Sequence, residues 1–532
     1  MPRKIASLML PATAAAVLAA SALPHAAHAA HAAAGAKAAN AAEATNAANA
    51  TSAVNATSAV NATSAAKVAA RNEAITQRHF AALLAGSEPK LAELTMFFTM
   101  MPKGGDLHHH YSGALYAEQY LEWVDQQHYC VNRSSYRIET DKATIAAEQA
   151  KPAAERACVT GQQVMGDNTL LAQVLQHWSD KDFYNHSGNQ SPPDRQFFDT
   201  FGYFGPVASS NAHDGLLRLK QRAIQENLSY IETIFELAPF THNDDFDREA
   251  LAHGVTDAAL EAYSAQLEHE QGYQQWIASY LDNLKTGSAG IDDAQFTMRY
   301  QPFVLRFLSP SQVFASMVSS FKLAAMSPQV VGVNIVGQES VNVSMRDYAM
   351  HMQMFKFLKA KYPNVKLALH AGELALGMVP PEGLTFHIKE AVEVAGASRI
   401  GHGMDIAHET NPLAIMKTMH DKGIAVEVNL SSNDFILGIK GAAHPVTLYR
   451  KYGVPFVLAT DDAGVSRNNL SGEYVLYAAR YRPDYAEVKK LSYDSLRYAF
   501  LAPADKQRLL KALDGKFARF EAAIAAAEPK RK

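Results

Sequence analysis

Short runs of apolar and β-branched residues recur along the chain from about residue 68, and they predict strands. The eight runs are residues 104–110, 230–236, 296–307, 330–337, 365–372, 399–403, 424–430 and 455–462. Between most of them, apolar residues return every three or four positions, as at 347–362 and 411–423, which predicts helices. Eight strands alternating with helices predict an α/β chain folded as a (β/α)8 TIM-type barrel. A doubly wound sheet would show the same alternation.

The first crossover is longer than one helix and two loops need, since 120 residues separate His110 from Tyr230. We therefore expect an insertion after the first strand, over about residues 127–168, within a barrel domain covering 67–532. This insertion contains Cys130 and Cys158, the only cysteines. In an exported protein two such cysteines favour a disulfide, and the alternative is a pair of buried thiols.

The N-terminus has the pattern of a secretory signal peptide. Arg3 and Lys4 precede an apolar stretch over 5–23, and an A-x-A cleavage pattern occupies 27–29. The stretch is rich in alanine and interrupted by Pro11, which disfavours a membrane anchor. We expect residues 1–29 to be a signal peptide and the mature protein to be periplasmic or extracellular, with no membrane partner after cleavage.

Residues 30–66 are of low complexity, and the sequence TSAVNA occurs at 51–56 and again at 57–62. Because this segment has few large apolar side chains, burial cannot compensate for its ordering entropy, and we expect a disordered linker. The formal net charge of the chain is -4, so bulk charge gives no indication of a nucleic-acid partner. Oligomeric state is not predicted by any of these patterns.

Polar residues gather at the C-terminal ends of the predicted strands. His108 and His110 end the first, His370 and His402 end two later ones, and Asp461 with Asp462 ends the last. In a barrel these ends surround one mouth, where active sites are built. Side chains at positions i and i+2 of a strand share a face, so His108 and His110 can converge on one ion while His109 points the other way.

Three imidazoles and a carboxylate suit a divalent cation, above all zinc with water at an open coordination position. A zinc-bound water can lose its proton near neutral pH and act as a nucleophile. A nearby carboxylic acid, such as Glu373, can protonate the group under attack. Each element alone has an ordinary structural explanation, such as a capping acid or a core histidine, but their combination at strand ends favours a metal-dependent hydrolase.

The motifs MPKGGDLHHHYSG (101–113), GVNIVGQE (332–339), HAGE (370–373), RIGHG (399–403), SSN before HP (431–445) and TDD (460–462) resemble the adenosine deaminase family of metal-dependent amidohydrolases. The resemblance runs from about Met101 to Arg467. The signal peptide and the cysteine-bearing insertion are similar to the secreted, growth-factor-like branch of that family. The resemblance implies zinc-hydroxide attack on purine C6, which converts adenosine, and by extension 2′-deoxyadenosine, to the inosine product and ammonia.

The resemblance also implies a role for each matching residue. It implies that His108, His110, His370 and Asp461 bind one zinc ion per chain, that Glu373 protonates purine N1, that His402 orients or deprotonates the zinc-bound water, that Asp462 faces N7 and that the Gly337 amide faces N3.

Three positions depart from the family pattern. Ser112 stands where an aspartate often contacts ribose, Asn334 replaces an acid in the D-L-x-G stretch, and Ala463 replaces a proline after TDD. None of the three removes a metal ligand or Glu373. Ser112 remains a candidate for substrate binding, although the ribose contacts are not predicted.

Two alternative functions remain open. The chain could deaminate another 6-aminopurine, adenine or AMP, but the motif loops offer a phosphate only scattered cations such as Lys103 and Arg467. It could also be a secreted nucleoside-binding or signalling module without turnover. The complete set of metal ligands and the presence of Glu373 argue against this alternative.

Overall fold

The computed structural model describes residues 64–184 and 191–528. The chain divides into two compact units, Met1–Ala70 and Arg71–Lys532. The expected signal peptide and the expected linker lie outside the described residues, except for 64–66. Residues 64–84 are helical, in a segment rich in alanine, which has a high helix propensity. No described helix combines the length and the apolar character needed to cross a membrane.

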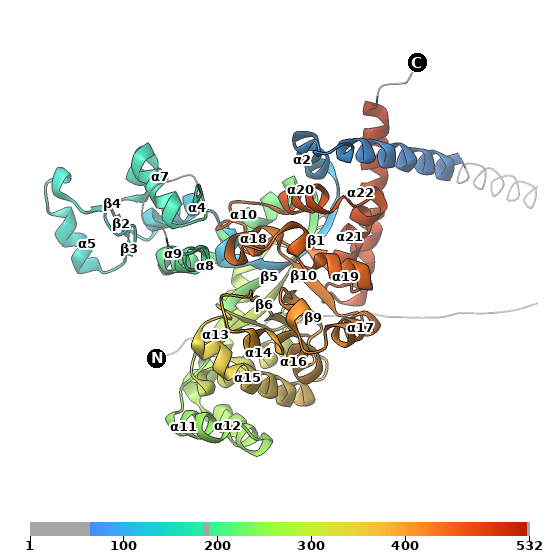
Figure 1. Cartoon of the computed structure of the whole chain (residues 1–532). Coiled ribbons are helices and arrows are strands. Elements are labelled where there is room, and N and C mark those ends of the chain that lie inside the picture. The colour runs from blue at the N-terminus through green and yellow to red at the C-terminus, as the bar shows by residue number, and fades with distance from the viewer. Residues whose placement is uncertain (1–63, 185–190, 529–532) are drawn as a thin grey trace, which may run out of the picture. The chain divides into compact units, whose positions relative to one another are not determined.

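Eight parallel strands form the centre of the second unit, and Figure 1 shows β1, β5, β6, β9 and β10 surrounded by helices. The strands are β1 (Lys103–His110), β5 (Leu228–Leu237), β6 (Thr297–Leu305), β7 (Asn334–Val336), β8 (Ala368–Ala371), β9 (Arg399–His402), β10 (Ala425–Val428) and β11 (Phe456–Leu458). They pair in two parallel sheets, in the orders β1-β5-β6-β7 and β11-β10-β9-β8. Each predicted strand is present, so the strand count from the sequence is confirmed.

Two bridges join the sheets into a closed ring. Val333 bridges Leu367 in parallel orientation, and His109 bridges Asp461 in the same way. The second closure is hydrogen bonded on both sides, because Asp461 N donates to His108 O at 2.9 Å and His110 N donates to Asp461 O at 3.1 Å. The predicted barrel is therefore confirmed, and the doubly wound alternative is wrong.

Helices follow most of the strands, as the sequence pattern predicts. The principal ones are α10 (Ala212–Gln225), α13 (Gln271–Gly287), α14 (Pro310–Met326), α15 (Asn342–Lys361), α17 (Pro412–Lys422), α19 (Val446–Tyr452), α20 (Leu470–Tyr481), α21 (Tyr485–Arg497) and α22 (Pro503–Ala527). The apolar faces of these helices and the strands share one large buried core. This packing holds the strand ends, and the residues on them, in fixed positions.

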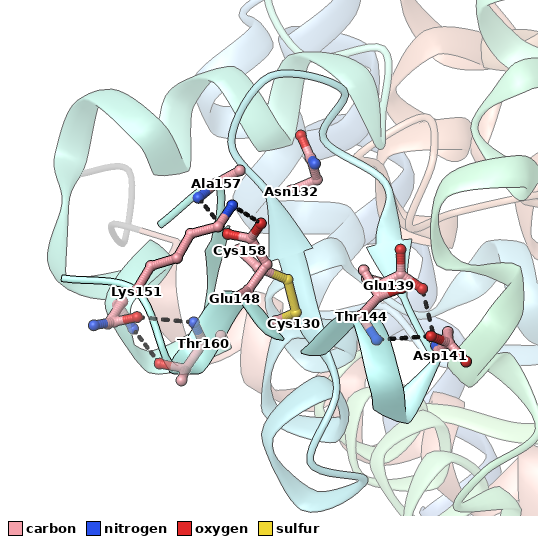
Figure 2. Close-up of a disulfide and its surroundings, with 12 residues drawn as sticks. Cys130, Asn132, Glu139, Asp141, Thr144, Glu148, Lys151, Ala157, Cys158 and Thr160 are labelled. Carbon is pink, nitrogen blue, oxygen red and sulfur yellow. Dashed lines mark hydrogen bonds and ion pairs between the residues drawn. A yellow bond between two sulfur atoms is a disulfide. The ribbon is translucent and has the colours of Figure 1, made fainter. Parts of the chain in front are cut away.

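The segment between β1 and β5 contains an additional small sheet. Strands β2 (Cys130–Asn132), β3 (Ile138–Glu139) and β4 (Cys158–Val159) pair antiparallel in the order β3-β2-β4. A disulfide joins Cys130 to Cys158, with Cα atoms 5.6 Å apart, and Figure 2 shows it between the strands. The predicted disulfide is confirmed. The sheet itself was not expected, because strands of two or three residues are too short for an alternating pattern.

Elements outside the barrel continue past the expected end of the insertion. Helices α7 (Asn168–His177), α8 (Pro193–Asp199) and α9 (Phe201–Ala208) precede α10. The side chain of Gln338, in the loop after β7, donates a hydrogen bond to Asp194 Oδ2 of α8 at 3.1 Å. This contact ties α8 to a loop at the C-terminal mouth of the barrel.

Candidate active site

The four predicted metal ligands meet at the barrel mouth. His110 Nε2 lies 3.1 Å from His370 Nε2 and 3.3 Å from Asp461 Oδ1, and His108 Nε2 lies 3.4 Å from the same oxygen. One ligand atom from each of the four residues lies within 4.8 Å of the others. The strands therefore bring together side chains that are up to 353 positions apart in the sequence.

His109 lies apart from this cluster, as strand alternation predicts. Its Nδ1 is 3.0 Å from Thr233 Oγ1 on the neighbouring strand β5. Burial, followed by the positive field of His110, lowers the pKa of His109 to about 3. A neutral imidazole bonded to a threonine has a structural role and not a ligand role.

The backbone at two site residues adopts an uncommon conformation. His402 has φ of 64° and Asp461 has φ of 59°, in the left-handed region that few non-glycine residues occupy. Such conformations persist only where the surrounding structure enforces them, and they concentrate at functional sites. At Asp461, the backbone hydrogen bonds with His108 and His110 that close the barrel hold this conformation.

A buried relay holds the ring of His108. Its Nδ1 lies 2.7 Å from Glu427 Oε2 on β10, and Glu427 forms an ion pair with Arg399 on β9. Arg399 forms a second ion pair with Glu232, which lies across the barrel on β5. Since the carboxylate of Glu427 only accepts, His108 Nδ1 carries the proton, and the Nε2 lone pair faces the cluster.

A second relay starts from the same Glu232 and ends at His370. Glu232 Oε1 accepts from Gln301 Nε2 at 2.8 Å, Gln301 Oε1 accepts from Asn334 Nδ2 at 3.1 Å, and Asn334 Oδ1 is 2.8 Å from His370 Nδ1. A carboxylate can only accept, so each amide has one possible orientation and His370 Nδ1 is the protonated nitrogen. Asn334 replaces the acid of the family pattern, but its amide oxygen still accepts a hydrogen bond from His370. The acceptor is therefore kept, although it carries no charge.

A third relay determines which nitrogen of His402 carries a proton. The backbone N–H of Val446 donates to His444 Nδ1 at 3.1 Å, so the proton of His444 is on Nε2, which is 3.1 Å from Asn433 Oδ1. Asn433 Nδ2 then donates to His402 Nδ1 at 2.9 Å. Because Nδ1 of His402 accepts, its proton is on Nε2, which faces the cluster. Burial lowers the pKa of His402 to about 3, so the ring is neutral.

Glu373 is buried beside this cluster, with Oε1 3.7 Å from His402 Nε2. Burial, and then the negative charges of Asp461 and Glu339, raise the pKa of Glu373 well above its ordinary value. Glu339 also accepts the backbone N–H of Glu373 at 2.9 Å and lies 3.3 Å from Arg306 Nη1. The loop after β8 therefore places Glu373 at the edge of the metal-ligand group, in surroundings that favour its protonated form.

Asp462 is a second buried carboxyl at the site. Burial and the charge of Asp461 raise its pKa well above the ordinary value. Among the described residues its Oδ1 has no hydrogen-bond partner. A Cβ at Gly113 would lie 1.5 Å from that oxygen, so only glycine fits at residue 113. Because no described residue bonds Oδ1, a protonated Asp462 can present that oxygen as a hydrogen-bond donor to a bound molecule.

These residues line the inner part of a cavity of about 800 Å³. The inner part is formed by His110, His370, Glu373, His402, Asp461 and Asp462, and the lining also includes Ser112 and Gly337. Five phenylalanines line the same cavity, and we call the part that they form the outer part because Phe307 is exposed there: Phe197, Phe198, Phe201, Phe303 and Phe307. The volume is within the range of small-molecule sites. All the predicted site residues thus line one cavity, except His108, which belongs to the metal-ligand group but is not among the lining residues.

The cluster fits a divalent cation such as zinc. His108 Nε2 is buried and finds no hydrogen-bond partner among the described residues, and the Nε2 lone pair of His370 points at His110 Nε2. Four ligand atoms about 2 Å from a tetrahedral zinc ion lie about 3.3 Å from one another. The three distances of 3.1, 3.3 and 3.4 Å match that arrangement.

Glu427, Gln301, Asn433 and Glu339 are supporting residues to which the sequence reasoning assigned no role. Glu427 and Gln301 lie within otherwise apolar strand runs, in AVEV and YQPF. A polar side chain in the middle of a buried strand needs a buried partner, which is a signal that could have been used. Asn433 is the last residue of the SSN motif, and Glu339 is the last residue of GVNIVGQE.

The chain is similar to known deaminases in sequence and in structure. Residues 273–516 match the adenosine deaminase family model. Adenosine deaminase of Clostridium perfringens is 28% identical over 181 residues, which are 34% of this chain and 49% of that protein. Adenine deaminase of Agrobacterium fabrum is 27% identical over 215 residues, which are 39% of this chain and 58% of that protein. The matches thus span about half the length of these curated relatives.

A solved structure has the same fold. The N6-mAMP deaminase of Arabidopsis superposes with a TM-score of 0.50 and 17% identity, over 79% of this chain and 99% of that one. This likeness supports the barrel assignment, and at that identity it says nothing about the substrate of this chain.

Proposed function

Over residues 273–516 the chain belongs to the adenosine deaminase family, and we propose that the whole chain is a zinc-dependent deaminase of adenosine and 2′-deoxyadenosine. The observation that carries the proposal is a buried Glu373, whose pKa is raised well above its ordinary value, beside four convergent ligand atoms at a cavity. The overall reaction converts adenosine and water to inosine and ammonia. A C6–N bond breaks and a C6–O bond forms.

We assign the metal ion to His108, His110, His370 and Asp461. Bound zinc would lower the pKa of a water molecule and so supply a nucleophile near neutral pH. The two relays hold His108 and His370 with their Nε2 lone pairs facing the ligand group, where they would bind the ion. Such outer hydrogen bonds typically contribute a factor of about 10–100 in metal affinity or activity.

Glu373 acts as the general acid in this proposal. The purine ring becomes electrophilic at C6 when N1 accepts a proton, and a raised pKa keeps that proton on Glu373. The adjacent Glu339 supports this state, since its negative charge disfavours ionisation of Glu373.

His402 orients the nucleophile. The family resemblance leaves two roles open for His402, orientation of the water and removal of its proton, and the relay through Asn433 favours the first. With its proton on Nε2, a neutral His402 faces the cluster as a hydrogen-bond donor and cannot accept a proton there.

Asp462 and Gly337 recognise the purine. N7 is an acceptor, and Asp462 has a raised pKa and therefore a proton to donate. Gly337 presents its backbone at the cavity with φ of 99°, a conformation suited to glycine, and we assign its N–H to N3. Ser112, also on the cavity wall, is assigned to the sugar.

Two alternatives make different predictions. Adenine and AMP deaminases act on the same ring; one relative of this chain is named adenine deaminase, and one fold neighbour is named N6-mAMP deaminase. A nucleoside-binding module without turnover would bind adenosine and release no ammonia. We further propose that the mature protein is exported and acts on a small purine nucleoside rather than on nucleic acid.

The test is to incubate the purified, zinc-loaded full chain with adenosine and to measure ammonia release and the change in ultraviolet absorbance. Glu373→Gln, purified in the same way, reports any contaminating deaminase. We expect turnover by the wild type, its loss after chelation and its recovery with zinc. Binding of adenosine without ammonia release would contradict the proposal and favour the non-catalytic module.

A further inference from the structure

The outer part of the cavity differs in character from the inner part. Its wall is aromatic: Phe197, Phe198 and Phe201 come from α8 and α9, and Phe303 and Phe307 come from the end of β6 and the loop after it. Phe197 is buried, and α8 is tied to the barrel through the bond between Asp194 and Gln338. The wall is thus a packed part of the structure that offers apolar contact.

No lysine or arginine occurs among the described residues that line this cavity. Arg306 is the arginine next to the lining residues Leu305 and Phe307 in the sequence, but it is buried. It forms an ion pair with Glu339 and donates a hydrogen bond to the carbonyl oxygen of His370 at 2.8 Å. The two cations that the motif loops offered are also engaged elsewhere. Arg467 pairs with Glu118 at 2.8 Å, and Lys103 donates to the carbonyl oxygens of Met101 and Glu226. A phosphate in the outer cavity would therefore have no paired cation.

The chemistry of the ring places the sugar in that outer part. If C6 lies at the metal-ligand group, N9 lies on the far side of the bicyclic ring. The ribose, and whatever its 5′ carbon bears, then extends away from the ligands toward the phenylalanines. The volume of about 800 Å³ is near the upper end of the range for small-molecule sites, so a substituent beyond the ribose has room.

We propose that this site prefers 6-aminopurine nucleosides whose 5′ position bears an uncharged, apolar group, such as an alkylthio group, over nucleotides with a 5′ phosphate. This inference rests on the proposed function, because it requires C6 to lie at the metal-ligand group. It narrows the substrate class because the aromatic wall, built from α8, α9, β6 and the loop after β6, lies where the 5′ group would extend.

The test compares four compounds on the zinc-loaded full chain: adenosine, 5′-deoxy-5′-(methylthio)adenosine, AMP and adenine. We expect kcat/KM for the methylthio nucleoside to equal or exceed that for adenosine, and to exceed that for AMP by on the order of 100-fold. AMP turned over as well as the methylthio nucleoside, or adenosine clearly preferred to it, would overturn the inference while leaving a deaminase. No ammonia from any compound would overturn the proposed function, and the inference with it.

Variants test the aromatic wall directly. Phe201→Arg places a cation in the outer cavity and should raise the ratio of AMP to adenosine kcat/KM at least about tenfold, by a charge-assisted contact to phosphate. The matched control is Ser209→Arg, which adds the same charge at the exposed end of α9, outside the cavity, and should leave the ratio unchanged. Phe198→Ala adds no charge and should lower the preference for the methylthio nucleoside. An unchanged ratio in folded Phe201→Arg and Phe198→Ala would overturn the assignment of this wall to the 5′ group.

Discussion

The inner and outer parts of the cavity are built from different segments and by different physical rules. The inner part comes from the ends of the barrel strands, and the imidazole rings of His108, His370 and His402 are oriented by buried hydrogen bonds. The outer part comes largely from α8 and α9 between β1 and β5, and its wall is aromatic. In our proposals, the inner part determines the reaction and the outer part determines which nucleosides reach it.

The difference lies in how each part tolerates change. A buried polar relay loses its function when one member is left unsatisfied, because the unpaired partner retains its desolvation cost. An aromatic wall is less demanding, because apolar contact depends on area and shape and not on direction. Mutations should therefore affect turnover steeply in the inner part and substrate preference gradually in the outer part.

The largest effect on turnover should come from Glu373→Gln. Glutamine keeps the shape of the side chain but cannot transfer a proton to N1, so kcat should fall by about 100-fold or more. Bound zinc and melting temperature should be unchanged, because Glu373 is not a proposed ligand. Near-normal kcat together with lowered stability would show that Glu373 is a structural residue.

A matched control and the position of the next helix separate a catalytic role of Glu373 from a structural one. Glu382→Gln is the matched control, since Glu382 is exposed in the short helix at Pro381–Leu384, and it should leave kcat unchanged. A role for Glu373 as a helix cap is not supported, because the next described helix begins at Pro381, eight residues later.

A smaller loss should follow from Asn433→Asp. The aspartate has the same shape but only accepts, so His402 Nδ1 must donate to it and Nε2 loses its proton. If His402 orients the nucleophile by donation, kcat/KM should fall by about 10–100-fold, the usual range for such supporting groups. The tautomer of His402 can be followed by ¹⁵N NMR on the same protein.

The outcome distinguishes the two roles of His402. An unchanged or increased rate in Asn433→Asp, with the NMR signal showing an unprotonated Nε2, would mean that His402 removes a proton. Asn469→Asp is the control: its side chain caps α20 by accepting from Gly472 N, which an aspartate also does. It should change neither the rate nor the His402 signal.

The inner part was largely predictable from the sequence. His108 and His110 are two positions apart on a strand, and the remaining ligands end later strands, so the barrel topology alone brings them together. The residues that orient these ligands by hydrogen bonds were harder to predict. That His370 bonds Asn334, and that Gln301 orients Asn334, depends on which strands are neighbours in the closed ring, which sequence order does not specify by itself.

The outer part could not be predicted in the same way. Phe197, Phe198 and Phe201 lie about 90 residues after His110 and in no motif, and their pattern resembles any apolar helix face. Their place at the cavity follows from long-range contacts such as that between Asp194 and Gln338. The disulfide was predictable because the chain has only two cysteines, whereas the short sheet around it was not.

The smallest effect on turnover should come from the disulfide. Replacing both Cys130 and Cys158 by alanine opens a loop with a sequence separation of 28 residues. The free energy of unfolding should decrease by about 3 kcal/mol in the chain-entropy model, which lowers the melting temperature. Turnover of adenosine and bound zinc should change little below that temperature, because every proposed ligand and Glu373 belong to the barrel. The wild type should resemble the variant when reductant is added, and reductant should have no effect on the variant itself. A loss of zinc in the folded double variant would show that the small sheet supports the inner part, and the separation between the two parts would then be wrong.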